Sequence, residues 1–251
     1  MTAHEFLQTM YGDANNGYLT IWTMPDKRTA FFLISKTEAV TEYAESRFES
    51  HDVYYGVGLR KEKLGENQRG GNDDVVVIPA FWSDIDIKGP AHKEIALPAS
   101  IDEALAFLES LPLKPSFIVS SGNGLHVYWL FDKPLGIATE AHRTNIAAAL
   151  HGWQMFINSS ARERGWKFDN TSDLARVLRL PGGINHKLGN GVRCNVISSS
   201  DVRHAPFDFT PYIVHHDAVD SSSPVASTAD APKPIRLPKA IRYSLQTLRY
   251  R

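Results

Sequence analysis

The sequence predicts an α+β fold, with a mixed or antiparallel sheet and helices beside it. Residues 115–131 predict two strands joined by a tight turn at Gly122-Asn123-Gly124, because glycine and asparagine tolerate the positive φ angles that hairpin turns require. Residues 139–164 predict a long helix that ends at Gly165, since apolar residues recur there at spacings of three and four. These two segments define the class, and the remaining elements follow in chain order.

The first half of the chain alternates short helices with strands. The elements expected there are a helix at 2–11, strands at 18–23 and 30–34, a helix at 37–50, and strands at 53–59 and 75–87. Ser35 and Glu38 form a candidate capping box for the second helix. The polar segment 60–74 reads as a mobile loop whose four basic residues either face solvent or contact phosphates. Pro79 predicts a bulge or bend in the last strand.

The second half adds the hairpin and two helices. The elements expected there are a helix at 102–110, strands at 115–121 and 125–131, a helix at 139–164, an extended segment at 166–169, a segment of unassigned type at 176–180, and a strand at 193–198. Ser100 and Glu103 form a second candidate capping box, and Leu105 and Leu108 would face the core together. The apolar stripe of the long helix consists of Ile146, Leu150, Trp153 and Ile157.

Composition indicates an ordinary globular chain. Of 251 residues, 43% are apolar and 22% are charged, and the formal net charge is −1. No apolar run approaches the roughly 20 residues that a membrane helix needs, and residues 1–10 do not resemble a signal peptide. A single cysteine, Cys194, excludes an internal disulfide framework and a thiolate zinc site. We therefore expect a cytoplasmic protein with no membrane partner, in which any binding of polyanions is local.

The chain divides into three parts. We expect a folded domain at 1–214 and a linker at 215–234, where large apolar residues are almost absent. Residues 235–251 carry five basic residues and no acid, which predicts a helical tail that begins a further domain.

The run Phe81-Trp82-Ser83-Asp84-Ile85-Asp86-Ile87 carries the first candidate site. In a strand, Asp84 and Asp86 share one face and the isoleucines share the other. Two adjacent carboxylates repel each other unless a cation lies between them, and a hard divalent cation such as Mg²⁺ or Mn²⁺ takes such oxygen ligands. The alternative is a strand whose acidic face is solvated.

The hairpin turn is the second candidate site. Ser121, Gly122 and Gly124 surround a turn whose backbone N–H groups have little steric cover, which suits phosphate oxygens. His126 begins the return strand and can donate to a phosphate. The alternatives are an ordinary hairpin turn and a partly buried strand histidine.

The third candidate site lies within 168–187. Asp169 is a possible third carboxylate, and Asp173 is its rival, although Asp173 can equally neutralise Arg176. Arg176 and Arg179 are three residues apart, on one side of a helical turn if the segment is helical, and arginine suits phosphate recognition. Lys187 follows a proline–glycine turn.

The three sites together suggest one chemistry. Carboxylates at strand ends can hold two metals about 4 Å apart, which stabilises the attacking and leaving oxygens of an in-line phosphoryl displacement. A glycine turn with a histidine, together with arginines and a lysine, would hold a triphosphate. This is the layout of a nucleotidyltransferase.

Three motifs in this order resemble the archaeo-eukaryotic primase superfamily, in its bacteriophage and plasmid primase-polymerase branch. They span roughly residues 18–200 and read FWSDID at 81–86, SGNGLHVY at 121–128, and FD at 168–169 followed by RVLRLPGGINHK at 176–187. The resemblance implies a catalytic sheet like an RNA-recognition motif, joined to a small N-terminal α/β module.

The resemblance also implies roles. Asp84, Asp86 and Asp169 would be catalytic metal ligands for Mg²⁺ or Mn²⁺ in a two-metal site, with Asp173 still open as the third. Nucleotide binding would involve Ser121, Gly122, Gly124, His126, Arg176, Arg179 and Lys187. Many relatives have serine where this chain has Gly124, and Ser121 or the backbone N–H groups would compensate.

The implied activity is a DNA primase-polymerase that joins NTPs or dNTPs on single-stranded DNA during phage or plasmid replication in a bacterial host. Relatives often continue into a helical bundle and a helicase. Two other classes remain: a glycosyltransferase, which also uses a pair of aspartates and a nucleotide donor, and a replication-initiation or DNA-binding module without catalysis.

Overall fold

A computed structural model describes residues 1–213 and confirms the α+β class. The helices are α1 (Ala3–Tyr11), α2 (Thr37–Glu45), α3 (Ile101–Ser110), α4 (Glu140–Arg162) and the 3₁₀ helices η1 (Asn72–Asp74) and η2 (Pro206–Tyr212). The strands are β1 (Tyr18–Met24), β2 (Thr29–Leu33), β3 (Asp52–Gly56), β4 (Leu59–Arg60), β5 (Val75–Asp86), β6 (Phe117–Ser120), β7 (Gly124–Gly136), β8 (Val177–Arg179), β9 (Ile184–Asn185), β10 (Val192–Arg193) and β11 (Asn195–Ser199).

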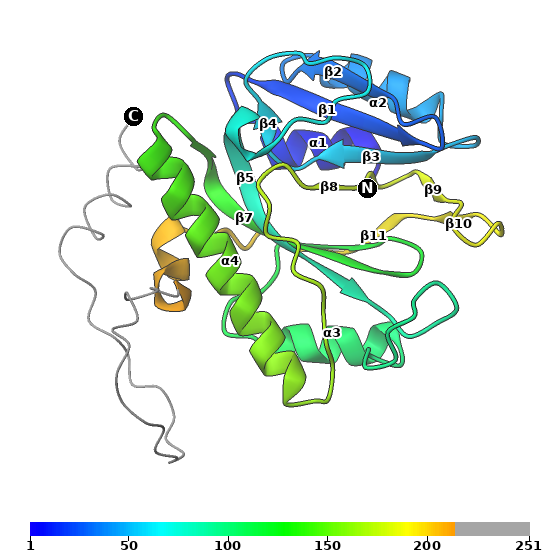
Figure 1. The fold of residues 1–251 in the computed structure, drawn as a ribbon, viewed down its shortest axis with the longest axis vertical. Coiled ribbons are helices and arrows are strands. Elements are labelled where there is room, and N and C mark those ends of the chain that lie inside the picture. The colour runs from blue at the N-terminus through cyan, green and yellow to red at the C-terminus, as the bar shows by residue number, and fades with distance from the viewer. Residues whose placement is uncertain (214–251) are drawn as a thin grey trace, which may run out of the picture.

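One antiparallel sheet runs through the described part of the chain (Figure 1). Its strand order is β11-β6-β7-β5-β4-β1-β3-β8, and β2 pairs with β1 outside this path. The long strands β5 and β7 form the centre, and the short strand β4 connects them to the N-terminal strands. The strands β9 and β10 form a separate hairpin. The expected N-terminal module is therefore continuous with the central sheet through β4.

Helix α1 packs between the two halves of the sheet. Its N-terminus has a complete capping box, in which Thr2 and Glu5 each accept from the other's backbone N–H. The Phe6 ring lies 5.6 Å from the Tyr55 ring on β3 and 5.8 Å from the Tyr128 ring on β7. These contacts fix the N-terminal strands against the central pair and so define the space between them.

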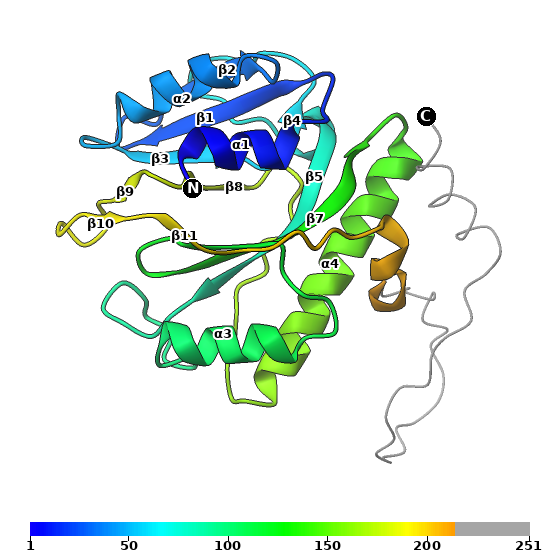
Figure 2. The same ribbon diagram turned by 180° about the vertical axis from the view of Figure 1, so that it is seen from behind.

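Helices α3 and α4 lie together on the other side of the central strands, as both views show (Figures 1 and 2). The predicted stripe of α4 is confirmed, because all four of its apolar members are buried. Trp153 contacts Trp129 of β7 edge to face, with ring centroids 5.2 Å apart. On α3, Phe107 and Leu108 are buried while Leu105 is only half-buried, so the core-facing side is rotated from the predicted one.

Several predicted boundaries are wrong for identifiable reasons. Helix α2 ends at Glu45 rather than Ser50, and its N-cap is Lys36 without a side-chain cap, so the box at Ser35 does not form. The single strand expected at 53–59 is two strands, β3 and β4, which pair with β1 separately. The bulge at Pro79 is confirmed, because the β5–β7 register shifts between Ile78 and Ala80.

Arg60 corrects the expected solvated loop at 60–74. It belongs to β4 and is fully buried, and its guanidinium donates to the carbonyls of Gly58, Arg69 and Ala175 at 2.5, 2.8 and 2.8 Å. Burial lowers the pKa of Arg60 to about 10, so it stays protonated.

No helix within residues 1–213 combines the length and apolar character needed to cross a membrane. The expected linker at 215–234 and basic tail at 235–251 lie outside the described residues.

Candidate functional site

The register of β5 against β7 brings the first two candidate motifs together. Asp84 lies opposite His126, and Asp86 lies opposite Gly124. Directly opposed residues in an antiparallel pair place their side chains on the same face of the sheet. The aspartate pair and the hairpin histidine, which are separated by 40 residues of sequence, are therefore neighbours.

A polar cavity of about 390 Å³ opens over this face. The carboxylate, histidine and basic side chains that line it are Asp52, Asp84, Asp86, His92, His126, Arg179 and Lys187. Ser121 and Asn123 of the hairpin turn also line it. The structure thus gathers residues from all three motifs around one space, which excludes the reading of the two aspartates as a fully solvated strand face.

The two carboxyls of the pair are held in an environment that opposes their charge. Burial raises the pKa of Asp84 to about 6, against the opposing charges of Arg176 and His92. Burial also raises the pKa of Asp86 to about 6, and the charge of Asp84 adds to this rise. A bound cation would stabilise the ionised form of these two adjacent carboxyls, which burial disfavours. The pair therefore fits a hard divalent metal such as Mg²⁺ or Mn²⁺.

His126 is a neutral imidazole at pH 7. Burial lowers its pKa to about 3, and the charges of Arg179 and Arg176 lower it further. Its Nε2 lies 3.7 Å from Oδ1 of Asp84, which is a contact of a neutral ring and not an ion pair. Its buried Nδ1 has no hydrogen-bond partner among residues 1–213. A neutral ring carries one N–H donor, on Nδ1 or Nε2 according to its tautomer.

His92 was missed by the sequence reasoning. Its Nδ1 lies 3.1 Å from Oδ2 of Asp86, and its Nε2 lies 3.1 Å from the Asn123 carbonyl. It thus connects the metal-site candidate to the hairpin turn. It lies in an irregular segment six residues beyond β5, where no periodic or turn pattern marks it.

The hairpin turn depends on its two glycines for different reasons. Gly122 has a φ of +93°, which confirms the predicted turn chemistry. Gly124 has no such constraint, but a Cβ there would lie 2.6 Å from the Ile85 carbonyl oxygen. This close approach beside Asp86 accounts for glycine at this position. Ser121 closes the turn by donating its N–H to the Gly124 carbonyl at 2.9 Å.

Arg179 reaches the cavity from β8 and is held by two residues of β3. Its Nη1 donates to Oδ1 of Asp52 at 2.5 Å, and its guanidinium lies 4.7 Å from the centre of the Tyr54 ring. Because β8 is a strand, the helical-turn arrangement considered for Arg176 and Arg179 is wrong. Asp52 and Tyr54 were not singled out from the sequence.

Lys187 is positioned by Asn185, another residue that the sequence reasoning missed. The Asn185 side chain donates to the Ser121 carbonyl at 2.7 Å and accepts from the Lys187 N–H at 3.0 Å. Asp52 adds a second anchor, accepting from the His186 N–H at 2.8 Å. These bonds join the 184–187 segment to the hairpin turn and place the lysine at the cavity.

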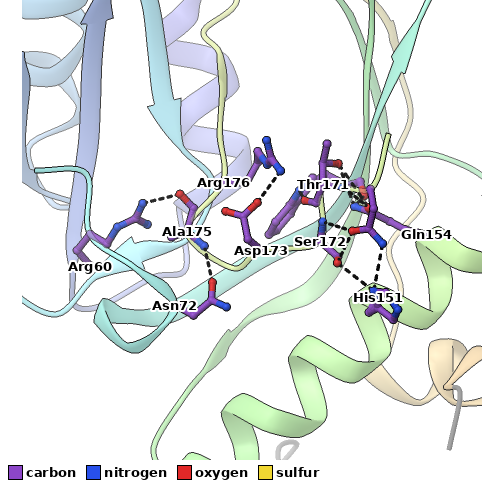
Figure 3. A network of polar contacts seen from close by, with 11 residues as sticks. Arg60, Asn72, His151, Gln154, Thr171, Ser172, Asp173, Ala175 and Arg176 are labelled. Carbon is purple, nitrogen blue, oxygen red and sulfur yellow. Dashed lines mark hydrogen bonds and ion pairs between the residues drawn. The ribbon is translucent and has the colours of Figure 1, made fainter. Parts of the chain in front are cut away.

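The two rivals for the third carboxylate have different surroundings. Asp173 forms an ion pair with Arg176 at 2.6 Å (Figure 3), as its alternative reading anticipated. Asp169 is exposed, and its charge contributes to the raised pKa of both Asp84 and Asp86. Within residues 1–213, no three His, Cys, Asp or Glu side chains already form a metal-ligand group. The third ligand therefore stays a prediction.

The fold is similar to those of solved primases. The AEP domain of the primase-polymerase of cyanophage S-2L matches with a TM-score of 0.55 and 14% identity, over 84% of this chain and 95% of that chain. The primase RepB′ gives a TM-score of 0.47 at 10% identity, over 83% of this chain and 60% of that chain. The catalytic domain of RepB′ in complex with initiator DNA gives 0.46 at 10% identity, over 82% and 90%.

No protein-family model and no curated protein sequence matches the chain. At 14% identity, the similarity to the cyanophage domain shows a shared fold and does not by itself show a shared function. The chemistry is therefore inferred from this chain's own residues. The aspartate pair, the hairpin histidine and two basic residues of the third motif lie around one cavity. The chain shares the fold of this AEP domain, as the resemblance of its three motifs implied.

Proposed function

We propose that this protein is a DNA primase-polymerase, which joins nucleoside triphosphates on a single-stranded DNA template with release of pyrophosphate. The observation that carries the proposal is the cavity, where the aspartate pair of β5 shares one lining with Arg179 and Lys187. Separate acidic and basic groups around one polar space suit a ligand that brings both a metal and a triphosphate. Phage or plasmid replication, with a helicase as a further partner, is the expected setting.

The cationic residues bind the incoming nucleotide. Arg179 is pre-oriented by Asp52 and Tyr54, so its guanidinium keeps a fixed direction toward the cavity. Lys187, two residues after β9, adds a compact charge. The neutral ring of His126 donates one N–H to a phosphate oxygen without adding a charge that would compete for the nearby carboxylates.

The acidic residues hold the metal. Asp84 and Asp86, with Asp169 as the third ligand, would bind Mg²⁺ or Mn²⁺, which supplies charge neutralisation at the α-phosphate and at the attacking 3′-hydroxyl. The raised pKa of both β5 carboxyls supports this assignment, because a bound cation would stabilise the ionised form that burial disfavours.

The test is extension of labelled single-stranded DNA, with and without a primer, in the presence of Mg²⁺ or Mn²⁺. Homopolymer templates are supplied with each ribo- and deoxynucleotide in turn. Incorporation of only the complementary nucleotide, with release of pyrophosphate, supports the proposal. Binding of DNA without incorporation under all conditions would instead identify a DNA-binding module, and incorporation that ignores the template would exclude a template-directed polymerase.

A further inference from the structure

The segment 168–175 carries both rival carboxylates yet has no helix or strand. Its backbone is held instead by side chains from four surrounding elements (Figure 3). Gln154 and Trp82 hold Thr171, and Asn72 and Arg60 hold Ala175. These few side chains therefore set the position of the segment, and each of them can be tested by substitution.

Gln154 of α4 makes the most extensive of these contacts. It is buried, and its Oε1 accepts from the Thr171 N–H at 2.8 Å. Its Nε2 donates to the Trp82 carbonyl at 2.8 Å and to the Thr171 hydroxyl at 3.2 Å. One amide side chain therefore bridges the backbone of β5 and the backbone of the 168–175 segment.

Trp82 completes the bridge from the other direction. Its indole Nε1 donates to the Thr171 carbonyl at 2.9 Å, so both backbone polar groups of Thr171 are fixed by side chains. Trp82 lies two residues before Asp84 on the same face of β5, and Thr171 lies two residues after Asp169. The bridge thus ties the strand of the aspartate pair to the segment of the third candidate.

Asn158 provides a second anchor, one helical turn along α4 from Gln154. Its Oδ1 accepts from the Phe168 N–H at 3.1 Å, and the residue is buried. Residues four apart on a helix lie on one face. The two amides of α4 therefore hold the backbone on both sides of Asp169, while the Asp169 side chain itself remains exposed.

We propose that Gln154 and Asn158 are positioning residues that hold Asp169 as the third carboxylate beside Asp84 and Asp86. This inference rests on the proposed function, whose metal site it deepens. Asp173 lies outside the pair of anchors and is occupied by Arg176. The two amides act through the backbone and do not touch the metal.

The test measures Mn²⁺ affinity of the full chain by electron paramagnetic resonance, which does not require activity. Gln154→Met and Asn158→Leu remove the anchors with little change in volume. Each is expected to weaken Mn²⁺ binding about tenfold, the low end of the effect of groups that orient metal ligands. Asp169→Asn should weaken it at least as much. Met155→Gln, at an exposed position of the same helix, is the matched control and should bind as the wild type does.

A double-mutant cycle separates positioning from general loosening of the fold. Gln154→Met in a chain that already carries Asp169→Asn should cause no further loss, because the carboxylate it positions is gone. A full additional loss, or a weakening by Asp173→Asn in place of Asp169→Asn, would overturn the inference. If Gln154→Met does not fold by circular dichroism, the same cycle is run with Asn158→Leu and Asp169→Asn.

Failure of the inference differs from failure of the proposed function. A wild-type chain that binds Mn²⁺, with anchor variants that bind it equally well, would overturn the positioning role alone. A wild-type chain that binds no Mn²⁺ would overturn the metal site and the positioning role together.

Discussion

Gly124→Ala tests the contact between the hairpin turn and the aspartate pair. The added Cβ would lie 2.6 Å from the Ile85 carbonyl oxygen and 3.2 Å from the Cα of Asp86. An ordinary carbon–oxygen contact is at least about 3.3 Å, so β5 and β7 must separate by about 0.7 Å at this point. Overpacking of this kind costs about 1–3 kcal/mol of unfolding free energy.

Gly136→Ala is the matched control at the far end of the same strand. No heavy atom lies within 4 Å of its Cβ position, and its φ lies outside the left-handed region. This variant should be neutral or stabilised by up to about 1 kcal/mol, because alanine restricts the unfolded chain. The same substitution is therefore expected to destabilise the fold at one end of the strand and not at the other.

Urea unfolding followed by circular dichroism measures both variants. A lowered midpoint with an unchanged slope is expected for Gly124→Ala alone. Nucleotide incorporation should fall as well, because the strand movement displaces Asp86 from its neighbours. Equal midpoints for the two variants would refute the close approach of the turn to β5, and with it the explanation for glycine at this position.

Three further results are expected. Arg60→Lys should lower the unfolding free energy by about 3 kcal/mol in urea, because lysine cannot reach all three buried carbonyls. Burial holds the pKa of His204 below its ordinary value, so the unfolded chain binds its proton first and stability falls as the pH drops below about 6.5. His204→Gln, which removes the ring beside the Lys114 carbonyl, should make the loss between pH 7.5 and 5.5 smaller in urea unfolding. Arg179→Lys should raise the KM for nucleotide about tenfold while the affinity for DNA is unchanged, since lysine cannot keep both the bond to Asp52 and the cavity contact.

The sequence was sufficient for those parts of the fold that local patterns encode. The hairpin, the strand of the aspartate pair and the stripe of α4 follow from periodicity and turn chemistry, and all were predicted, although the hairpin expected at 115–131 extends to Gly136. Asp84, Asp86 and His126 were found because they lie in such patterned segments, and the sheet register then places them together.

The remaining features depend on contacts between distant segments. Asp52 meets Arg179 across 127 residues, and no local signal marks either as a partner. Arg60 begins a polar run and was assigned to a solvated loop. It is buried instead, and it donates hydrogen bonds to carbonyls from three segments. Gln154 and Asn158 were not singled out on the predicted helix, because their partners belong to a segment without periodicity. Tertiary hydrogen bonds of this kind leave no pattern in the sequence.

Template-directed nucleotide incorporation by the wild type and by Asp86→Asn is the most direct test of the central claim. Asp201→Asn, the same change at an exposed position, is the control for folding and handling. The wild type and Asp201→Asn should extend a primer with the complementary nucleotide in the presence of Mn²⁺. Asp86→Asn should fold normally and incorporate none. Full incorporation by a folded Asp86→Asn chain would contradict the assignment of the cavity as a nucleotidyl-transfer site.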